Sequence, residues 1–101
     1  MTDAGLLDYL QEWYANRCNG EWEHQYGVKI ETLDNPGWQV EVDLGDMSRD
    51  FRRVEHHAGA DDWLTCWVED GKFHGACSPK NLSRVLSVFR DCTQGRRSSQ
   101  P

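Results

Sequence analysis

Four cysteines and four histidines are the residues of this 101-residue chain best suited to bind a metal ion. The cysteines are widely spaced and form no CxxC pair, so the sequence has neither a zinc-ribbon nor a thioredoxin-type motif. His56 and His57 are adjacent, and adjacent residues on a strand point to opposite faces. Cys18, His24 and His74 could converge in the fold, but nothing in their spacing predicts a site. We therefore expect neither a metal nor a cofactor.

Catalysis would need a nucleophile with a base, or two carboxylates that divide the acid and base roles. The acidic pairs 61–62 and 69–70 fall at strand ends or turns, where acids commonly only solvate a loop. Cys77 and His74 could pair, yet no glycine-rich or serine-bearing turn surrounds a nucleophile, and no GxxxxGK phosphate loop occurs. We expect that the protein is not an enzyme. The alternative is a small cytosolic enzyme with a carboxylate or Cys/His site that uses Cys66 or Cys77.

The formal net charge of −6 disfavours direct binding to nucleic acid. The charge is unevenly spread along the chain. Residues 1–46 contain ten acidic and two basic residues, whereas residues 47–101 contain seven acidic and nine basic ones. The acidic half can serve solubility alone, or it can steer a basic partner toward the protein. The sequence leaves both interpretations open.

The sequence also indicates a compartment. No apolar run approaches the roughly 18 residues that a membrane helix needs, and the first residues, "MTDAGLLDYL", carry acids where a signal peptide carries bases. We expect a cytoplasmic protein that does not bind membranes. In that reducing environment Cys18, Cys66, Cys77 and Cys92 should be free thiols, and the last three should be small core residues.

Hydrophobic periodicity predicts an α+β domain. Its order is an N-terminal helix, about five mostly antiparallel strands in a meander sheet, and a C-terminal helix, with both helices on one face. The first helix follows Asp3 as N-cap, and the last opens with Ser78 as N-cap and Pro79 as its first helical residue. The expected strands are residues 28–33, 38–44, 51–57 and two within 63–77 that join through Asp70 and Gly71.

We assign residues 1–94 to a single domain and residues 95–101 to a polar, disordered tail, and we expect a monomer. Alternation of apolar and polar residues predicts which side chains form the core. The predicted core residues are Leu10, Trp38, Val40, Val42, Leu64 and Phe89, together with one of Trp63 and Trp67.

The stretch "CNGEWEHQYG", residues 18–27, connects the first helix to the first strand and contains Trp22 between two acids. Trp22 and Tyr26 can plug the end of the sheet, with their polar edges bonded to the loop backbone. Trp22 can instead be an aromatic anchor on a binding surface, a role in which tryptophan and tyrosine are common. Both interpretations remain open at this point.

The sequence contains four specific motifs: the W-Y end of the first helix, N-G-x-W-E-H-x-Y-G, L-D-N-P-G-W and D-W-x-x-C-x-V-E-D-G-x-F. Together they resemble the immunity protein 53 family of bacterial polymorphic toxin systems, and the similarity runs from about Leu6 to Phe89. The resemblance implies a cytoplasmic antidote that binds and neutralises a cognate toxin protein. It supplies no catalytic mechanism.

An acidic small domain without an evident active site is suited to occlude a basic enzyme, for example a nuclease whose cleft expects phosphate. On the second strand Glu41 and Asp43 alternate with apolar residues and should point outward. The candidate partner-binding residues are Glu21, Trp22, Glu23, His24, Tyr26, Glu31, Asp34, Glu41 and Asp43.

Overall fold

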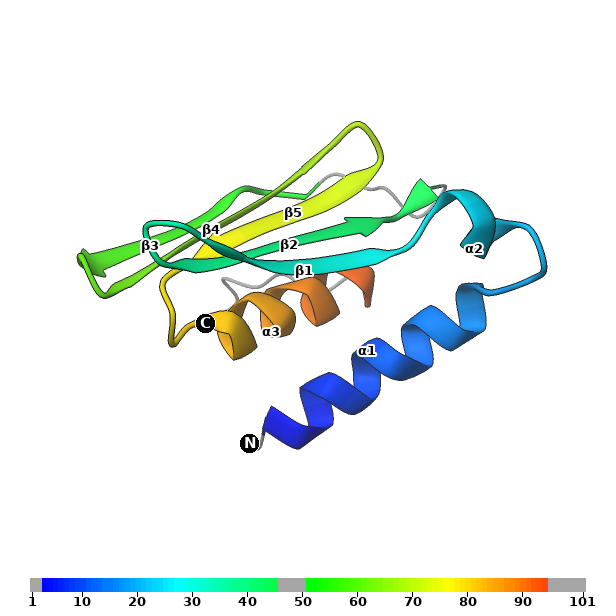
Figure 1. Cartoon of the computed structure of the whole chain (residues 1–101), viewed down its shortest axis with the longest axis horizontal. Coiled ribbons are helices and arrows are strands. Elements are labelled where there is room, and N and C mark those ends of the chain that lie inside the picture. Colours follow the sequence, from blue (N-terminus) through cyan, green and yellow to red (C-terminus); the bar gives the residue numbers. More distant parts are fainter. Residues whose placement is uncertain (1–2, 46–50, 95–101) are drawn as a thin grey trace.

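The computed structural model describes residues 3–45 and 51–94, which form two layers (Figure 1). One layer is a five-stranded antiparallel sheet, and the other consists of two helices on a single face of that sheet. These helices, α1 (Asp3–Arg17) and α3 (Leu82–Thr93), pack against each other, and the short helix α2 (Trp22–Gln25) follows α1. The predicted α+β class is confirmed. The tail predicted at residues 95–101 lies outside the described residues.

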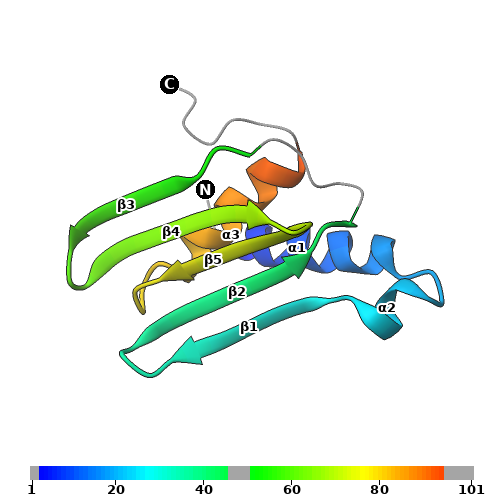
Figure 2. The same ribbon diagram turned by 90° about the horizontal axis from the view of Figure 1, so that it is seen from above.

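The sheet combines a hairpin with a three-stranded meander. Its strands are β1 (Val28–Leu33), β2 (Gly37–Asp43), β3 (Val54–Gly59), β4 (Asp62–Glu69) and β5 (Lys72–Cys77). Their spatial order is β1-β2-β5-β4-β3, and every neighbouring pair is antiparallel. The β1–β2 hairpin therefore meets the β3–β4–β5 meander where β2 pairs with β5, and β5 is the central strand (Figure 2).

The hairpin predicted at Asp70 and Gly71 is confirmed. Both residues have positive φ angles, 56° and 74°, as the favoured two-residue hairpin turns require. Asp70 is the only non-glycine residue with a positive φ in the described ranges, and aspartate tolerates this conformation better than most residues. This turn fixes the register that places alternate residues of β4 and β5 on opposite faces.

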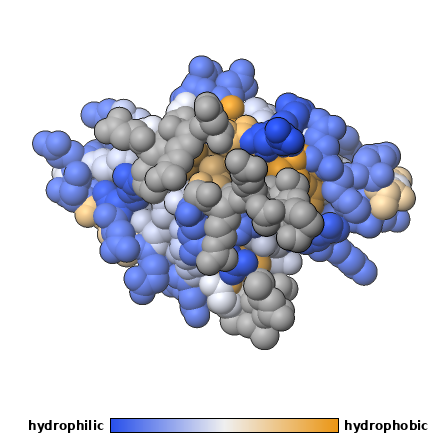
Figure 3. Space-filling model, turned by 180° about the vertical axis from the view of Figure 1, so that it is seen from behind, coloured by the Kyte–Doolittle hydropathy of each residue, from blue (hydrophilic) through white to orange (hydrophobic). Residues whose placement is uncertain are grey.

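The core lies between the sheet and the two helices. On α1, Leu6, Leu10 and Trp13 recur at three- and four-residue spacing and are all buried, so one side of the helix faces the core. The other buried apolar residues are Val40, Val42, Leu44, Leu64, Cys66, Phe73, Cys77, Val85, Leu86, Val88, Phe89 and Cys92. Burial is thus confirmed for every predicted core residue outside the three tryptophans. Seen from behind, the surface is mostly hydrophilic, with small hydrophobic areas between the hydrophilic ones (Figure 3).

The tryptophan predictions were partly wrong. Trp38 is only partly buried, because it lies beside the β1–β2 turn, where its indole Nε1 donates to the carbonyl oxygen of Pro79 at 2.9 Å. Neither Trp63 nor Trp67 belongs to the core. Both alternate with the buried Leu64 and Cys66 on β4, so they lie on the face of the sheet that the helices leave open.

The C-terminal helix begins later than predicted, at Leu82 with Asn81 as its N-cap. Ser78 does not cap it, because its hydroxyl is engaged with the backbone of Trp63, accepting from the amide at 3.1 Å and donating to the carbonyl oxygen at 3.2 Å. The helix α2 was not predicted at all, and β3 begins three residues after the strand expected at 51–57.

Candidate partner-binding surface

The corner at residues 18–27 is stabilised by its own side chains. Both carboxylate oxygens of Glu23 accept backbone hydrogen bonds, from the amide of Asn19 at 2.9 Å and from that of Gly20 at 2.8 Å. Asn19 Oδ1 in turn accepts hydrogen bonds from the amides of Glu21 and Trp22, both at 2.9 Å. It thereby provides an acceptor for backbone N–H groups at the start of α2, which have no partner within the helix. The pKa of Glu23 is lowered by backbone hydrogen bonds, first from its own amide and then from Asn19 and Gly20.

Trp22 packs as part of this corner. Its ring meets Trp13 and Tyr14 edge-on at centroid distances of 6.1 Å and 6.0 Å, and it lies at a tilt to Tyr26 at 6.2 Å. The Trp22 side chain also contacts the main core. The packing part of the plug interpretation thus applies to Trp22, which is partly buried against Trp13 and Tyr14 of α1. The candidates of this corner that face outward are Glu21, His24 and Tyr26, and Tyr26 is 49% exposed.

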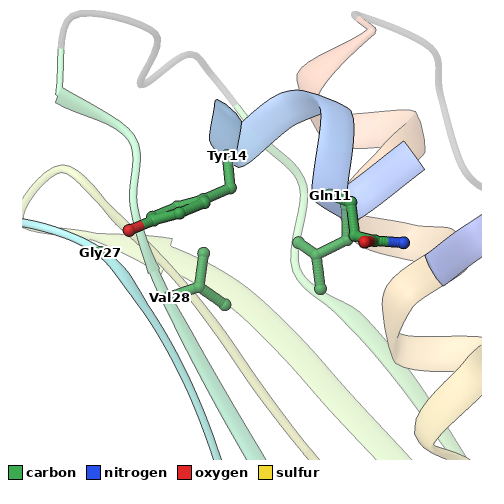
Figure 4. A pocket seen from close by; sticks show the side chains of 5 residues that line it. Gln11, Tyr14, Gly27 and Val28 are labelled. Atoms are coloured by element: carbon green, nitrogen blue, oxygen red, sulfur yellow. The ribbon is translucent and has the colours of Figure 1, made fainter. Parts of the chain in front are cut away.

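A shallow apolar groove of about 340 Å³ lies between α1 and the beginning of β1. Leu10, Gln11, Tyr14, Gly27 and Val28 line it (Figure 4). The Tyr14 ring reaches toward Gly27 and Val28, whereas the amide of Gln11 points away from them (Figure 4). The groove offers one phenol and one amide among aliphatic groups, so it suits an apolar or aromatic side chain rather than an ion.

The acidic candidates outside the corner do not form one cluster. Glu31, Glu41 and Asp43 lie on the open face of the β1–β2 hairpin, which confirms the outward orientation predicted for Glu41 and Asp43. Asp34 lies in the hairpin turn, at the opposite end of the sheet from α2 (Figure 2). The nine candidate residues therefore divide among the corner, the open face and the turn.

Each acid of the open face of the hairpin has a different partner. Asp43 Oδ2 accepts a hydrogen bond from the backbone amide of Gly27 at 2.9 Å, and Lys72 Nζ lies 3.9 Å from Asp43 Oδ1. Glu31 pairs with Lys29 of its own strand at 3.7 Å. Glu41 Oε2 lies 3.7 Å from His74 Nδ1 on β5, and its side chain is 30% exposed.

Sequence reasoning missed the centre of the open face. Trp67 stacks on His74 with ring centroids 5.1 Å apart and an interplanar angle of 13°, and the guanidinium of Arg53 lies 5.2 Å from the Trp67 ring. The sequence of β4 did indicate which side chains point away from the core. Leu64, Cys66 and Val68 alternate there with Trp63, Thr65, Trp67 and Glu69. Because Trp63 and Trp67 are four residues apart, strand alternation places both on the same face, opposite Leu64 and Cys66, and the expectation that one of them lies in the core was wrong.

The buried thiols are poorly suited to catalysis. Burial raises the pKa of Cys66 to about 12, and burial also raises the pKa of Cys77, so neither thiolate is available near neutral pH. Cys77 lies on the covered face and His74 on the open face, so the pair cannot act together. All four cysteines are thiols rather than members of a disulfide, and Cys92 is buried with Cys66 and Cys77, as predicted.

The acid pair 61–62 has a structural role through Asp62. Its Oδ1 accepts from the buried Asn81 at 3.0 Å and lies 3.0 Å from His56 Nε2 and 3.4 Å from Arg84 Nη1. The hydrogen bond from Asn81, followed by the interactions with His56 and Arg84, lowers the pKa of Asp62. These contacts fasten the N-terminus of α3 to the β3–β4 hairpin.

Within residues 3–45 and 51–94, no three His, Cys, Asp or Glu side chains gather closely enough to hold a metal ion. None of the helices in those ranges is long and apolar enough to span a membrane.

The open face presents Trp67 and His74 beside the acidic Glu41, and tryptophan is among the residues enriched at the centres of protein interfaces. Residues 7–94 match the family model described as immunity protein 53, and the chain belongs to this family. The predicted family is thus confirmed. Membership supports an immunity function, suggests a non-enzymatic role and implies a toxin as the partner. No curated protein and no solved structure gave a significant match.

Proposed function

We propose that the protein is a cytoplasmic immunity protein of a bacterial polymorphic toxin system. It binds a cognate toxin effector as a monomer and neutralises it by occluding the surface on which the toxin acts. Family membership over residues 7–94 is the observation that carries this proposal. The protein then needs no catalytic group of its own, because a stoichiometric complex is enough to block the toxin.

The toxin surface that we propose is basic, as in a nuclease whose cleft binds phosphate. The charge of residues 1–46 supports this, since ten acidic and two basic residues give that half an attractive field for a cationic partner. The steering residues in this proposal are Glu21, Glu23, Glu31, Asp34, Glu41 and Asp43. Glu23 and Asp43 also hold backbone amides in place, so reversing their charge would disturb the fold as well as the field.

Co-expression tests the immunity function directly. The toxin to be tested is the C-terminal domain of a large secreted protein, sought in the reading frame next to this gene and produced in a bacterial host with or without this chain. We expect growth arrest by the toxin alone, rescue by the chain, and recovery of both proteins in one complex. Continued arrest in the presence of folded chain would overturn the proposed function.

Steering is tested by charge reversal at two positions that hold no backbone group. Replacing Glu31 and Glu41 by Lys should slow association with that toxin domain most at low salt, and the difference should shrink as salt rises. Asp8→Lys with Glu12→Lys on α1 is the matched control, because it changes the net charge equally from exposed positions on the other layer. Equal slowing by both pairs would assign the effect to net charge rather than to the sheet face.

A further inference from the structure

The open face of the sheet carries one row of side chains that crosses the strands β2, β5 and β4 and ends at Arg53, just before β3. Strand register places Glu41 of β2 beside His74 of β5, and His74 beside Trp67 of β4. Arg53, the residue before β3, reaches the Trp67 ring. The row therefore runs Glu41, His74, Trp67, Arg53, and both long described helices lie on the other side of the sheet (Figure 1).

Contacts along this row hold its members in place. Glu41 is 3.7 Å from His74, the imidazole is stacked on the indole at 5.1 Å, and the Arg53 guanidinium lies 5.2 Å from the indole centroid. The indole Nε1 also donates to Glu69 at 3.3 Å. Side chains that are already ordered lose little conformational entropy when a partner docks, so such a row is preorganised for binding.

The charges of the row indicate what it would bind. Lys29 lies opposite Glu41 in the sheet but forms its ion pair with Glu31, and Lys72 is paired with Asp43. In the described residues His74 is the only ion-pair partner of Glu41. A cationic side chain from a partner would therefore find an incompletely neutralised carboxylate next to a broad aromatic surface.

We infer that the row from Glu41 to Arg53 is the centre of the toxin-binding surface, and that it receives a lysine or arginine side chain of the toxin at Glu41. This inference rests on the proposed function and makes it specific. Trp67 supplies the apolar contact area, a role in which tryptophan dominates binding energy at protein interfaces. Glu41 supplies the charge, and His74 and Arg53 are positioning residues that fix the indole from either side.

The experiment measures the dissociation constant of the complex with the C-terminal domain encoded by the neighbouring reading frame. Trp67→Ala and Glu41→Arg should each weaken binding at least about tenfold, the size expected for residues at the centre of an interface. The matched controls are Leu7→Ala, which truncates an exposed apolar side chain of α1, and Glu12→Arg on the same helix, and both should stay within about twofold of the parent. The loss from Trp67→Ala should persist at high salt, because an aromatic contact is not screened.

Circular dichroism checks that each variant is folded. If Trp67→Ala does not fold, the affinity of Glu41→Arg alone tests the inference. The Glu41 side chain is partly exposed and is not part of the core, so its replacement should leave the fold intact. Parent-like affinity in Glu41→Arg and in folded Trp67→Ala would overturn the inference, and weakening by Tyr26→Ala instead would move the contact to the corner. Loss of a dimer rather than of toxin binding would also overturn it, by assigning the face to a second copy. Absence of binding by the parent would overturn the proposed function itself.

Discussion

The covered and open faces of the sheet differ in chemistry although alternate residues of the same strands build both. Phe73 and His74 are neighbours on β5. Phe73 is fully buried and packs edge-on against Phe89 of α3 at 5.4 Å. His74 faces the other way, between Glu41 and Trp67. The comparison teaches that one strand can supply stability through burial on one side and a preorganised binding surface on the other.

The largest difference between the faces should appear at these two neighbours. Phe73→Ala should lower the free energy of unfolding by about 3 to 5 kcal/mol, because it leaves a cavity in the core. His74→Ala removes a stacked ring at a partly exposed position and should cost about 0.5 to 1.5 kcal/mol. Urea denaturation measures both. Equal losses would show that the two faces contribute alike to stability.

A second test uses the glycine on the covered face of β5. A Cβ atom at Gly75 would lie 2.5 Å from Val85 Cγ1, so Gly75→Ala forces α3 away from the sheet and should cost about 1 to 3 kcal/mol. Ala76→Thr, one residue along on the open face, should change stability by less than about 0.5 kcal/mol. Adding Val85→Ala to Gly75→Ala should recover part of the loss, and no recovery would contradict the steric cause.

A third, smaller effect concerns the contacts that hold α3 beneath the sheet. Because the folded pKa of Asp62 lies below its usual value of 3.8, the ionised carboxylate stabilises the fold above that pH, and the contribution is lost as the pH falls through the folded pKa. Asp62→Asn should therefore be less stable than the parent at pH 7. The gap should narrow below about pH 3.8 when unfolding midpoints are compared across pH. A gap independent of pH would remove the charge as its cause.

The smallest effect should come from metal removal. Three buried cysteines lie on the covered side of the sheet, yet folding should not depend on a metal. We expect the melting temperature to be the same with and without a chelator, whereas a structural zinc would make folding metal-dependent. Stoichiometric zinc in protein purified without added metal would contradict this.

The sequence predicted the elements better than their arrangement. Asp70 and Gly71 predicted a hairpin turn correctly, because few other residues adopt the positive φ angles that it requires. The spacing of Leu6, Leu10 and Trp13 predicted a helix. The central position of β5 depends on which strand edges meet, and local patterns do not contain that information. Ser78 looked like a helix cap, but its hydroxyl binds a strand that is fifteen residues away in sequence.

The candidate surface was predictable only in part. Alternation along β2 correctly placed Glu41 on the outward side. Its neighbours across the sheet, His74 and Trp67, could not be found in the same way, because they become adjacent only through the β2–β5 and β4–β5 registers. Glu23 was predicted to bind the partner because of its charge. The structure gives it a local role as well, because its carboxylate accepts hydrogen bonds from backbone amides of its own loop.

The place of β5 in the sheet has a consequence for synthesis of the chain. The β1–β2 hairpin pairs with β5, which is the last strand to be synthesised. During synthesis the hairpin is therefore made before the strand that it pairs with. The meander and α3, in contrast, are contiguous and can form from short-range contacts once they emerge. Because chains fold as their segments appear, we expect a nascent protein that stops before Lys72 to remain without its sheet and unable to protect the cell.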